Sequence, residues 1–187
     1  IIWCTEMVGF GTLVILGIVI CSISVSMFYF IDNLTIDVTS ESGESIQISD
    51  VEFDVQFVST YEILEKKSEY IEFEKDLVAK GISTSETPDG IYFQIQITAH
   101  NMGTEAVRIT GGQIYLFDSN NTKYDAVFIG YGVGELSLID LEPNNSVVVT
   151  TQFDIPYDDQ MKYSVGIIPD RHGLQDSQER GFICVKN

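Results

Sequence analysis

Basic residues are scarce in this chain. Only 10 Lys and Arg stand against 28 Asp and Glu, so the formal net charge is −18 at pH 7. This composition argues against nucleic-acid binding, because a phosphate backbone requires a footprint of Lys and Arg. A strong negative charge keeps protein surfaces apart and soluble, as expected outside a cell or in a salty medium. Acidity alone does not separate these two settings.

Cysteine is scarce as well. The three cysteines are Cys4, Cys21 and Cys184, and the first two lie in an apolar N-terminal stretch. An odd number in these places does not form the disulfide framework of a small secreted scaffold. The sequence has no CxxC pair and no Cys/His spacing for zinc, so no structural metal is expected.

Sequence motifs for catalysis are missing too. The chain has no P-loop, no GxSxG and no GxGxxG that precedes a helix. The GYGVG stretch at Gly130–Gly134 lacks the Lys-Ser/Thr that follows a phosphate loop, so it is interpreted as a flexible loop. His100 and His172 each lie in a predicted turn, where a solvated histidine is commoner than a general base. We therefore predict no enzyme, with no catalytic and no cofactor-binding residues.

A long uncharged run opens the chain. Residues 8–31 carry no charge, and such a run exceeds the ~18 apolar residues that indicate a membrane-spanning helix. No Lys or Arg precedes Lys66, and acidic residues follow the run closely, so the acidic side is predicted to face outside. A basic leader cleaved before Ile1 would explain the missing positive charge. A chain boundary chosen at Ile1 would look the same.

After Ile31 the apolar residues alternate with polar ones at period two. This is the pattern of half-buried strands, and Asn-, Gly- and Asp-rich turns separate the runs, so a two-sheet β-sandwich is predicted. Residues 61–80 mix both signs of charge with apolar positions and fit either an exposed helix or an irregular segment. The predicted strands are residues 34–38, 46–57, 91–99, 106–110, 113–117, 147–153, 163–168 and 181–185.

Two stretches carry a family resemblance. Gly9–Ile23 (GFGTLVILGIVICSI) resembles the start of mature archaeal type IV pilins and archaellins, a glycine-rich turn of helix followed by continuous aliphatic residues. Bacterial type IV pilins place a glutamate at the fifth mature position, whereas this chain has Thr5 there and Glu6 one place later. Ile91–Pro156 is similar to the immunoglobulin-like domains of exported archaeal and bacterial proteins, through an Asn-x-Gly turn and a later LEPNNS turn.

The resemblance implies a fold class and a function. The implied fold is a long N-terminal α-helix, residues 1–31, followed by an acidic, extracellular, all-β immunoglobulin-like β-sandwich, residues 32–187, in a pilin-like architecture. The implied function is a structural subunit of an archaeal type IV pilus-like or archaellum-like filament. Such a subunit sits in the cytoplasmic membrane before it polymerises with copies of itself into an extracellular filament. The implied assembly residues are Ile1, Glu6, Gly9, Gly11, Gly17, Cys21, Phe28 and Phe30.

An alternative is a membrane-anchored extracellular β-sandwich binding module, similar to the archaellum stator proteins. Its partners would be ligands of the cell envelope or of another surface. The two interpretations differ in the role of the apolar run. A filament-core helix needs apolar residues on every face, whereas a bilayer anchor usually ends in basic residues on the cytoplasmic side.

Two kinds of modification or ligand site are also predicted. Three N-x-S/T sequons place glycosylation at Asn33, Asn120 and Asn144, two of them on predicted turns and one just after the apolar run. Asp118, Asn120 and Asp125 offer oxygen ligands at the density of a calcium loop. A hairpin turn requires the same Asp and Asn residues for conformational reasons, so both interpretations stay open.

Overall fold

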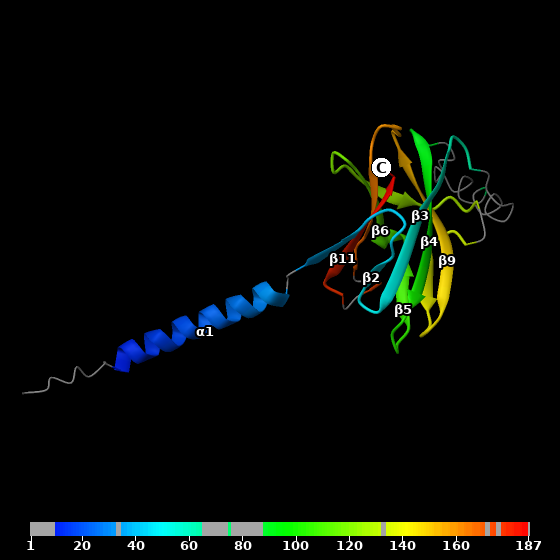
Figure 1. Cartoon of the computed structure of the whole chain (residues 1–187). Coiled ribbons are helices and arrows are strands. Elements are labelled where there is room, and N and C mark those ends of the chain that lie inside the picture. Colours follow the sequence, from blue (N-terminus) through cyan, green and yellow to red (C-terminus); the bar gives the residue numbers. More distant parts are fainter. Residues whose placement is uncertain are drawn as a thin grey trace, which may run out of the picture. The chain divides into compact units, whose positions relative to one another are not determined.

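The structure is a computed structural model that describes residues 10–32, 35–64, 75, 88–131, 134–170, 173–174 and 177–186. The chain divides into two compact units, Ile1–Thr35 and Ile36–Asn187. The first contains a helix, and the second is built of strands (Figure 1).

The N-terminal unit holds helix α1 (Phe10–Asp32). Its described side chains are Ile15 and residues 17–27, and all of them are exposed within this unit. The hydroxyls of Ser22 and Ser24 donate to the carbonyl oxygens of Ile18 and Ile20, at 2.8 and 2.9 Å. These bonds satisfy the hydroxyls inside the helix itself. No helix in the described part of the chain is both long enough and apolar enough to cross a membrane.

The predicted fold class is wrong in its helical part. In place of a pilin-like chain that opens with a long helix over residues 1–31, the described structure is mostly a β-sandwich. Its described helices are α1 and the short 3-10 helix η1 (Gly111–Gln113), and within α1 the side chains of residues 17–27 are described without a gap. The prediction of the helical part was wrong because every face of the uncharged run is apolar. Without a polar face there is no 3.6-residue period to define a helix or its partner. Only the all-β part of the prediction agrees with the structure.

The second unit is a β-sandwich made from one long, folded sheet. In the described residues its nine strands follow the order β1-β11-β10-β6-β7-β9-β4-β3-β2, and β5 pairs with β8 in a separate ribbon. All neighbours in these sheets are antiparallel except β1 and β11. The bounds are β1 (Ile36–Ser40), β2 (Ile46–Ile48), β3 (Val51–Tyr61), β4 (Ile91–Asn101), β5 (Val107–Thr110), β6 (Ile114–Asp118), β7 (Lys123–Val127), β8 (Leu138–Leu141), β9 (Ser146–Ile155), β10 (Tyr163–Ile167) and β11 (Glu179–Lys186).

The two ends of the long sheet meet and close the core. A Cβ added at Gly181 of β11 would lie 2.6 Å from Ile48 Cδ1 of β2, so these strands face each other closely. Phe93 of β4 is fully buried, and its ring centroid lies 4.6 Å from that of Phe57 and 5.1 Å from that of Tyr163 on β10. Burial of large apolar side chains from both layers is the main stabilising term of such a domain.

Three strand assignments differ from the prediction. The run predicted as one strand over 46–57 is a hairpin, β2 and β3, because Ser49 at the bend has a φ of 53°. The alternation signals this break, since Ile48 and Val51 both face the core although three positions separate them. Strands β7 and β8 were missed because they are short, with five and four residues, and because β7 has no fully buried residue and β8 has one.

Candidate functional site

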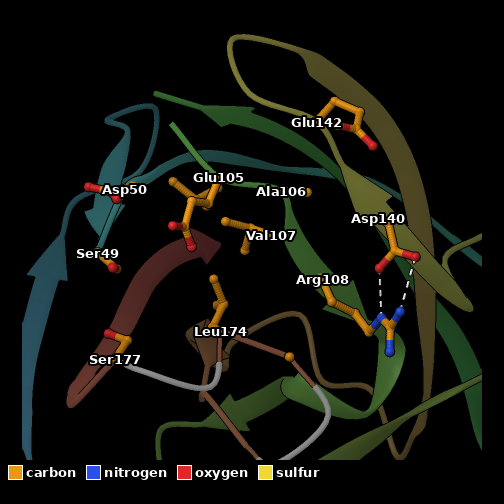
Figure 2. Close-up of a pocket in the computed structure, with 12 residues that line it drawn as sticks. Ser49, Asp50, Glu105, Ala106, Val107, Arg108, Asp140, Glu142, Leu174 and Ser177 are labelled. Carbon is orange, nitrogen blue, oxygen red and sulfur yellow. Dashed lines mark hydrogen bonds and ion pairs between the residues drawn. The ribbon is translucent and has the colours of Figure 1, made fainter. Parts of the chain in front are cut away.

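The described residues form a pocket of about 590 Å³ at one end of the sandwich (Figure 2). Four segments far apart in the sequence surround it: the β2–β3 bend, the β4–β5 connection with β5, strand β8, and the segment before β11. Pockets of ~300–1,000 Å³ are typical of small-molecule ligand sites. The lining residues are Ser49, Asp50, Val51, Glu105, Ala106, Val107, Arg108, Asp140, Glu142, Gly173, Leu174 and Ser177.

The β2–β3 bend is fixed from two sides. The Ser49 amide donates to Glu179 Oε2 at 2.8 Å, which ties the bend to the start of β11. The amide of Met102 donates to the carbonyl of Asp50 at 2.8 Å, which ties the bend to the end of β4. Because both bonds are long-range, the bend holds its place at the pocket mouth only in the folded domain.

Asn101 holds the β4–β5 connection in place. Its side chain is fully buried, and its Nδ2 donates to the carbonyls of Glu105 at 2.8 Å and Leu141 at 2.9 Å. Its Oδ1 accepts the amide of Gly103 at 2.9 Å. A buried amide with all these partners is a strong conformational restraint. The Asn-x-Gly turn was recognised from the sequence, but its link to β8 was not.

The floor of the pocket is apolar and closely packed. Val51 is fully buried and Leu174 is 6% exposed. Leu174 has a φ of 48°, an unusual conformation for a bulky residue, and its amide donates to the carbonyl of Arg108 at 3.2 Å. A Cβ at Gly173 would lie 2.6 Å from that same carbonyl oxygen. Glycine therefore allows this segment to approach β5 and form the floor.

The walls of the pocket are acidic. Among the described residues, the pocket is lined by the acidic Asp50, Glu105, Asp140 and Glu142 and by one basic residue, Arg108. Figure 2 shows the Arg108 guanidinium turned toward Asp140, with Nε 2.6 Å from Oδ1 and a terminal nitrogen 3.1 Å from Oδ2. The hydrogen bond from Arg108 lowers the pKa of the Asp140 carboxyl, and the same bond raises the pKa of Arg108. The pair neutralises itself, and three carboxylates remain to set the charge of the pocket.

The arrangement is suited to binding. The polar side chains in the described lining are four carboxylates, two serines and one arginine. Among these residues no hydrogen bond pairs a serine hydroxyl with a carboxylate as nucleophile and base. Small-molecule sites are usually lined mostly by apolar side chains with a few polar groups that orient the ligand. Here seven of the twelve described lining residues are polar or charged, so charge dominates over apolar contact. That the protein is not an enzyme remains a prediction.

The residues of the predicted calcium site are only partly brought together. Asp118 Oδ1 accepts the amides of Asn120 and Thr122, both at 2.8 Å, and Oδ2 accepts the Tyr124 hydroxyl at 3.2 Å. Asp125 lies on β7 with its side chain 82% exposed and one oxygen 3.8 Å from Lys123 Nζ. Across the described residues, no group of three or more His, Cys, Asp or Glu could hold a metal ion. Calcium binding stays a prediction.

Internal hydrogen bonds explain the charge state of Asp118. Burial acts to raise the pKa of this carboxyl, but the bonds accepted from Thr122, Asn120 and Tyr124 outweigh it. The pKa of Asp118 therefore lies below its ordinary value. The Asp and Asn residues here serve the hairpin turn between β6 and β7, as one of the two sequence interpretations proposed.

Two of the three sequons lie on exposed turns. Asn120 is exposed in the β6–β7 turn, and Asn144 is exposed in the β8–β9 turn with a φ of 60°. Asn33 lies outside the described residues. Glycosylation at all three positions stays a prediction.

The predicted assembly residues fall in the N-terminal unit. Ile1, Glu6 and Gly9 lie outside the described residues, and the side chains of Phe28 and Phe30 are not described either. Gly11 lies within α1. Gly17 and Cys21 are exposed on that helix within its own unit, and nothing lies within 4 Å of a Cβ built at Gly17. In the part of the N-terminal unit that the structure describes, no contact gives these residues a role in assembly.

Residues 40–171 match the family DUF4352, described as a domain of unknown function. The chain belongs to the DUF4352 family. The matched range begins at the end of β1 and stops before β11, so the DUF4352 match includes most of the pocket walls. Gly173, Leu174 and Ser177 of the pocket lie beyond it. No curated protein matches the chain.

Solved structures resemble the DUF4352 domain in fold. The yjhA protein from Bacillus subtilis aligns with a TM-score of 0.54 at 15% identity, over 78% of this chain and 98% of that one. A "putative lipoprotein (ycdA)" from Bacillus subtilis aligns with a TM-score of 0.51 at 14% identity, over 79% of this chain and 39% of that one. At these identities the similarity establishes the fold alone.

These comparisons correct the family resemblance. The chain was expected to be an archaeal pilin or archaellin, and it is instead a DUF4352 β-sandwich protein whose structural relatives named above are bacterial. The resemblance rested on a run of apolar residues. Such a run reports the preference of a segment for an apolar environment, which is shared by many unrelated families.

Proposed function

We propose that this chain is an exported β-sandwich protein that binds a ligand in the end pocket and does not catalyse a reaction. The pocket of about 590 Å³, with an apolar floor and acidic walls, carries this proposal. Its lining supplies charge and shape for recognition without the paired acid, base or nucleophile that catalysis requires.

Export has support of three kinds. The sequence opens with the uncharged run 8–31, and the net charge of −18 suits a protein that stays soluble at a surface. One relative of similar fold, ycdA, carries the word lipoprotein in its name. In this proposal the uncharged run brings the domain to the outer face of the membrane, and the DUF4352 domain meets its ligand there.

Protease accessibility tests the location. Intact cells that express the full chain with a C-terminal epitope tag are treated with a protease that does not enter cells. The tag is expected to be lost, while a tagged cytoplasmic protein in the same cells survives. Protection of the tag until the cells are lysed would contradict export.

A ligand screen tests the pocket independently of location. The full chain in detergent micelles is titrated with a library of small fragments, and the methyl signals of Val107 and Leu174 are followed by NMR. At least one fragment is expected to shift these signals saturably and to lose this effect in Ala106→Trp, which fills the exposed mouth of the pocket. A library without any such fragment would contradict a binding role for this pocket.

A further inference from the structure

We infer that the end pocket takes a lysine or arginine side chain from a basic peptide segment of a partner protein. This inference rests on the proposed function, since it names the ligand class of the same pocket. Three features of the described residues carry it: the apolar floor, the wall carboxylates that no described ion pair engages, and the internal pairing of Arg108, the one basic residue in the described lining.

The floor fits the aliphatic stem of a long basic side chain. The accessible apolar surface of the pocket comes mainly from Ala106, which is exposed, and Val107, which is half-buried. Leu174 adds little, at 6% exposure, and Val51 is fully buried. Lysine and arginine place their methylene stems against apolar surface while their charged ends stay near polar groups. A ligand that is charged throughout would leave this floor unused, and a fully apolar one would leave the carboxylates unused.

The walls fit the charged end. In the described part of the chain, no ion pair joins the carboxylates of Asp50, Glu105 or Glu142 to a cation. Figure 2 places the Glu105 carboxylate on the side of Leu174 and Ser49, above the floor. A cation that enters between the walls would therefore gain electrostatic attraction without displacing a partner.

Arg108 does not offset this charge. Its guanidinium is held by both oxygens of Asp140 in a bidentate pair, which is the strongest geometry for this contact. An anionic ligand would have to break this pair and approach three further carboxylates. The charge complementarity of the pocket therefore favours a cation over an anion.

Matched peptides test the inference on the full chain in detergent micelles. The probes are capped pentapeptides with four alanines and a central lysine, norleucine or glutamate, because norleucine has an aliphatic chain of similar length without the charge. The lysine peptide is expected to shift the methyl signals of Val107 and Leu174 saturably. The norleucine and glutamate peptides are expected to bind at least about tenfold more weakly.

Two double variants distinguish binding in the pocket from general attraction of a cationic peptide to an acidic protein. Glu105→Gln with Glu142→Gln removes two charges from the pocket, and Glu41→Gln with Asp125→Asn removes two from exposed positions outside its lining. We expect the first double variant to bind the lysine peptide at least about fivefold more weakly than the native chain. The second should change the affinity for this peptide less than about twofold. Equal weakening in both would mean general attraction to an acidic protein and would overturn the inference.

Further outcomes distinguish this inference from the proposed function. The norleucine and lysine peptides could bind the native chain equally, with neither binding Ala106→Trp. This result would overturn the cation preference but would still support a binding pocket. No saturable shift with the lysine peptide would also overturn the inference. In that case a fragment that still binds in the pocket would leave the proposed function standing.

Discussion

Asp118 shows at the residue scale how one side chain fixes a turn. Its two carboxylate oxygens accept three protein hydrogen bonds, and the residue is only 7% exposed. The hydrogen bonds of the turn therefore account for this cluster of Asp and Asn residues without a bound calcium ion, which was the other interpretation of the sequence. The same geometry makes stability depend on the charge of this carboxyl.

We expect Asp118→Ala to lower the free energy of unfolding by about 1–3 kcal/mol, because two amides and a hydroxyl lose their acceptor. Urea denaturation at neutral pH measures this. Asp118→Asn is the matched control, since it keeps an oxygen acceptor at the same place, and we expect a smaller loss. An alanine variant as stable as the native chain would contradict the role assigned to Asp118.

Acidic pH should remove part of the stabilisation that the Asp118 carboxylate provides. The folded-state pKa of Asp118 is lowered from 3.8, so its stabilisation is fully present above that value and is lost as the pH falls through the folded-state pKa. The difference in unfolding free energy between the native chain and Asp118→Ala should therefore shrink at acidic pH. A difference that stays constant down to the acid-unfolding range would contradict this assignment.

Gly173 is the second residue whose identity the fold requires. A Cβ there would lie 2.4 Å from Gln113 Oε1 and 2.6 Å from the Arg108 carbonyl oxygen. We expect Gly173→Ala to destabilise the domain by about 1–3 kcal/mol, because the pocket floor must move away from β5. At Gly112 the nearest atom would be 3.8 Å away, so Gly112→Ala is the control. Thermal unfolding of the two variants compares them.

At the scale of elements, the connection after β7 is organised by one carboxylate. Glu135 accepts the amides of Ile129 and Gly130, both at 2.6 Å, and of Tyr131 at 3.0 Å. It also accepts a bond from Gln152 on β9. The GYGVG stretch was interpreted from the sequence as a flexible loop. Two of its described residues, Gly130 and Tyr131, donate their amides to Glu135, a contact that no local sequence pattern predicts. Flexibility of the stretch stays a prediction.

We expect Glu135→Ala to speed amide hydrogen exchange at Ile129 and Gly130 by at least about tenfold, because charged acceptors contribute ~1.5–3 kcal/mol per bond. NMR-detected exchange measures each amide separately. Glu135→Gln keeps one oxygen acceptor and should give an intermediate rate. Amides in β4 serve as the internal reference, and an equal increase there would indicate global destabilisation instead of local release.

At the scale of the whole molecule, charge is the dominant property. A net charge of −18 on 187 residues creates repulsion that the folded state concentrates more than the unfolded chain does. Few basic residues are present to offset it, and two of the described ion pairs, Arg108–Asp140 and Arg180–Asp37, each engage one of them. The stability of the folded chain should therefore depend on ionic strength.

We expect the midpoint of thermal unfolding to rise when NaCl increases from about 0.01 M to about 0.5 M, because the screening length falls several-fold over this range. Circular dichroism measures the midpoint. A variant with Glu41→Gln, Glu62→Gln and Asp125→Asn, all at exposed positions, should show a smaller rise. A midpoint that falls with salt in the native chain would contradict repulsion as the controlling term.

The sequence by itself determined the class of the domain and much of its core. Alternation at period two identified the strands around Phe53, Ile95, Val149 and Val165, because a strand with one buried face repeats every second residue. It also located the turns at Asn101, Asp118 and Asn144, since these residues favour turn conformations for local reasons. The scarcity of basic residues by itself makes the protein strongly negative, whatever its fold.

Only the tertiary structure decided which strands are neighbours and where a ligand could bind. The pocket joins Asp50, Glu105, Glu142 and Leu174, which lie on four separate segments, and its floor depends on the approach of Gly173 to β5. Local periodicity encodes which face of a segment is buried, but it carries no information about the segment that will cover that face. The site is therefore a product of long-range pairing, and the apolar N-terminal run alone gave no guide to the family.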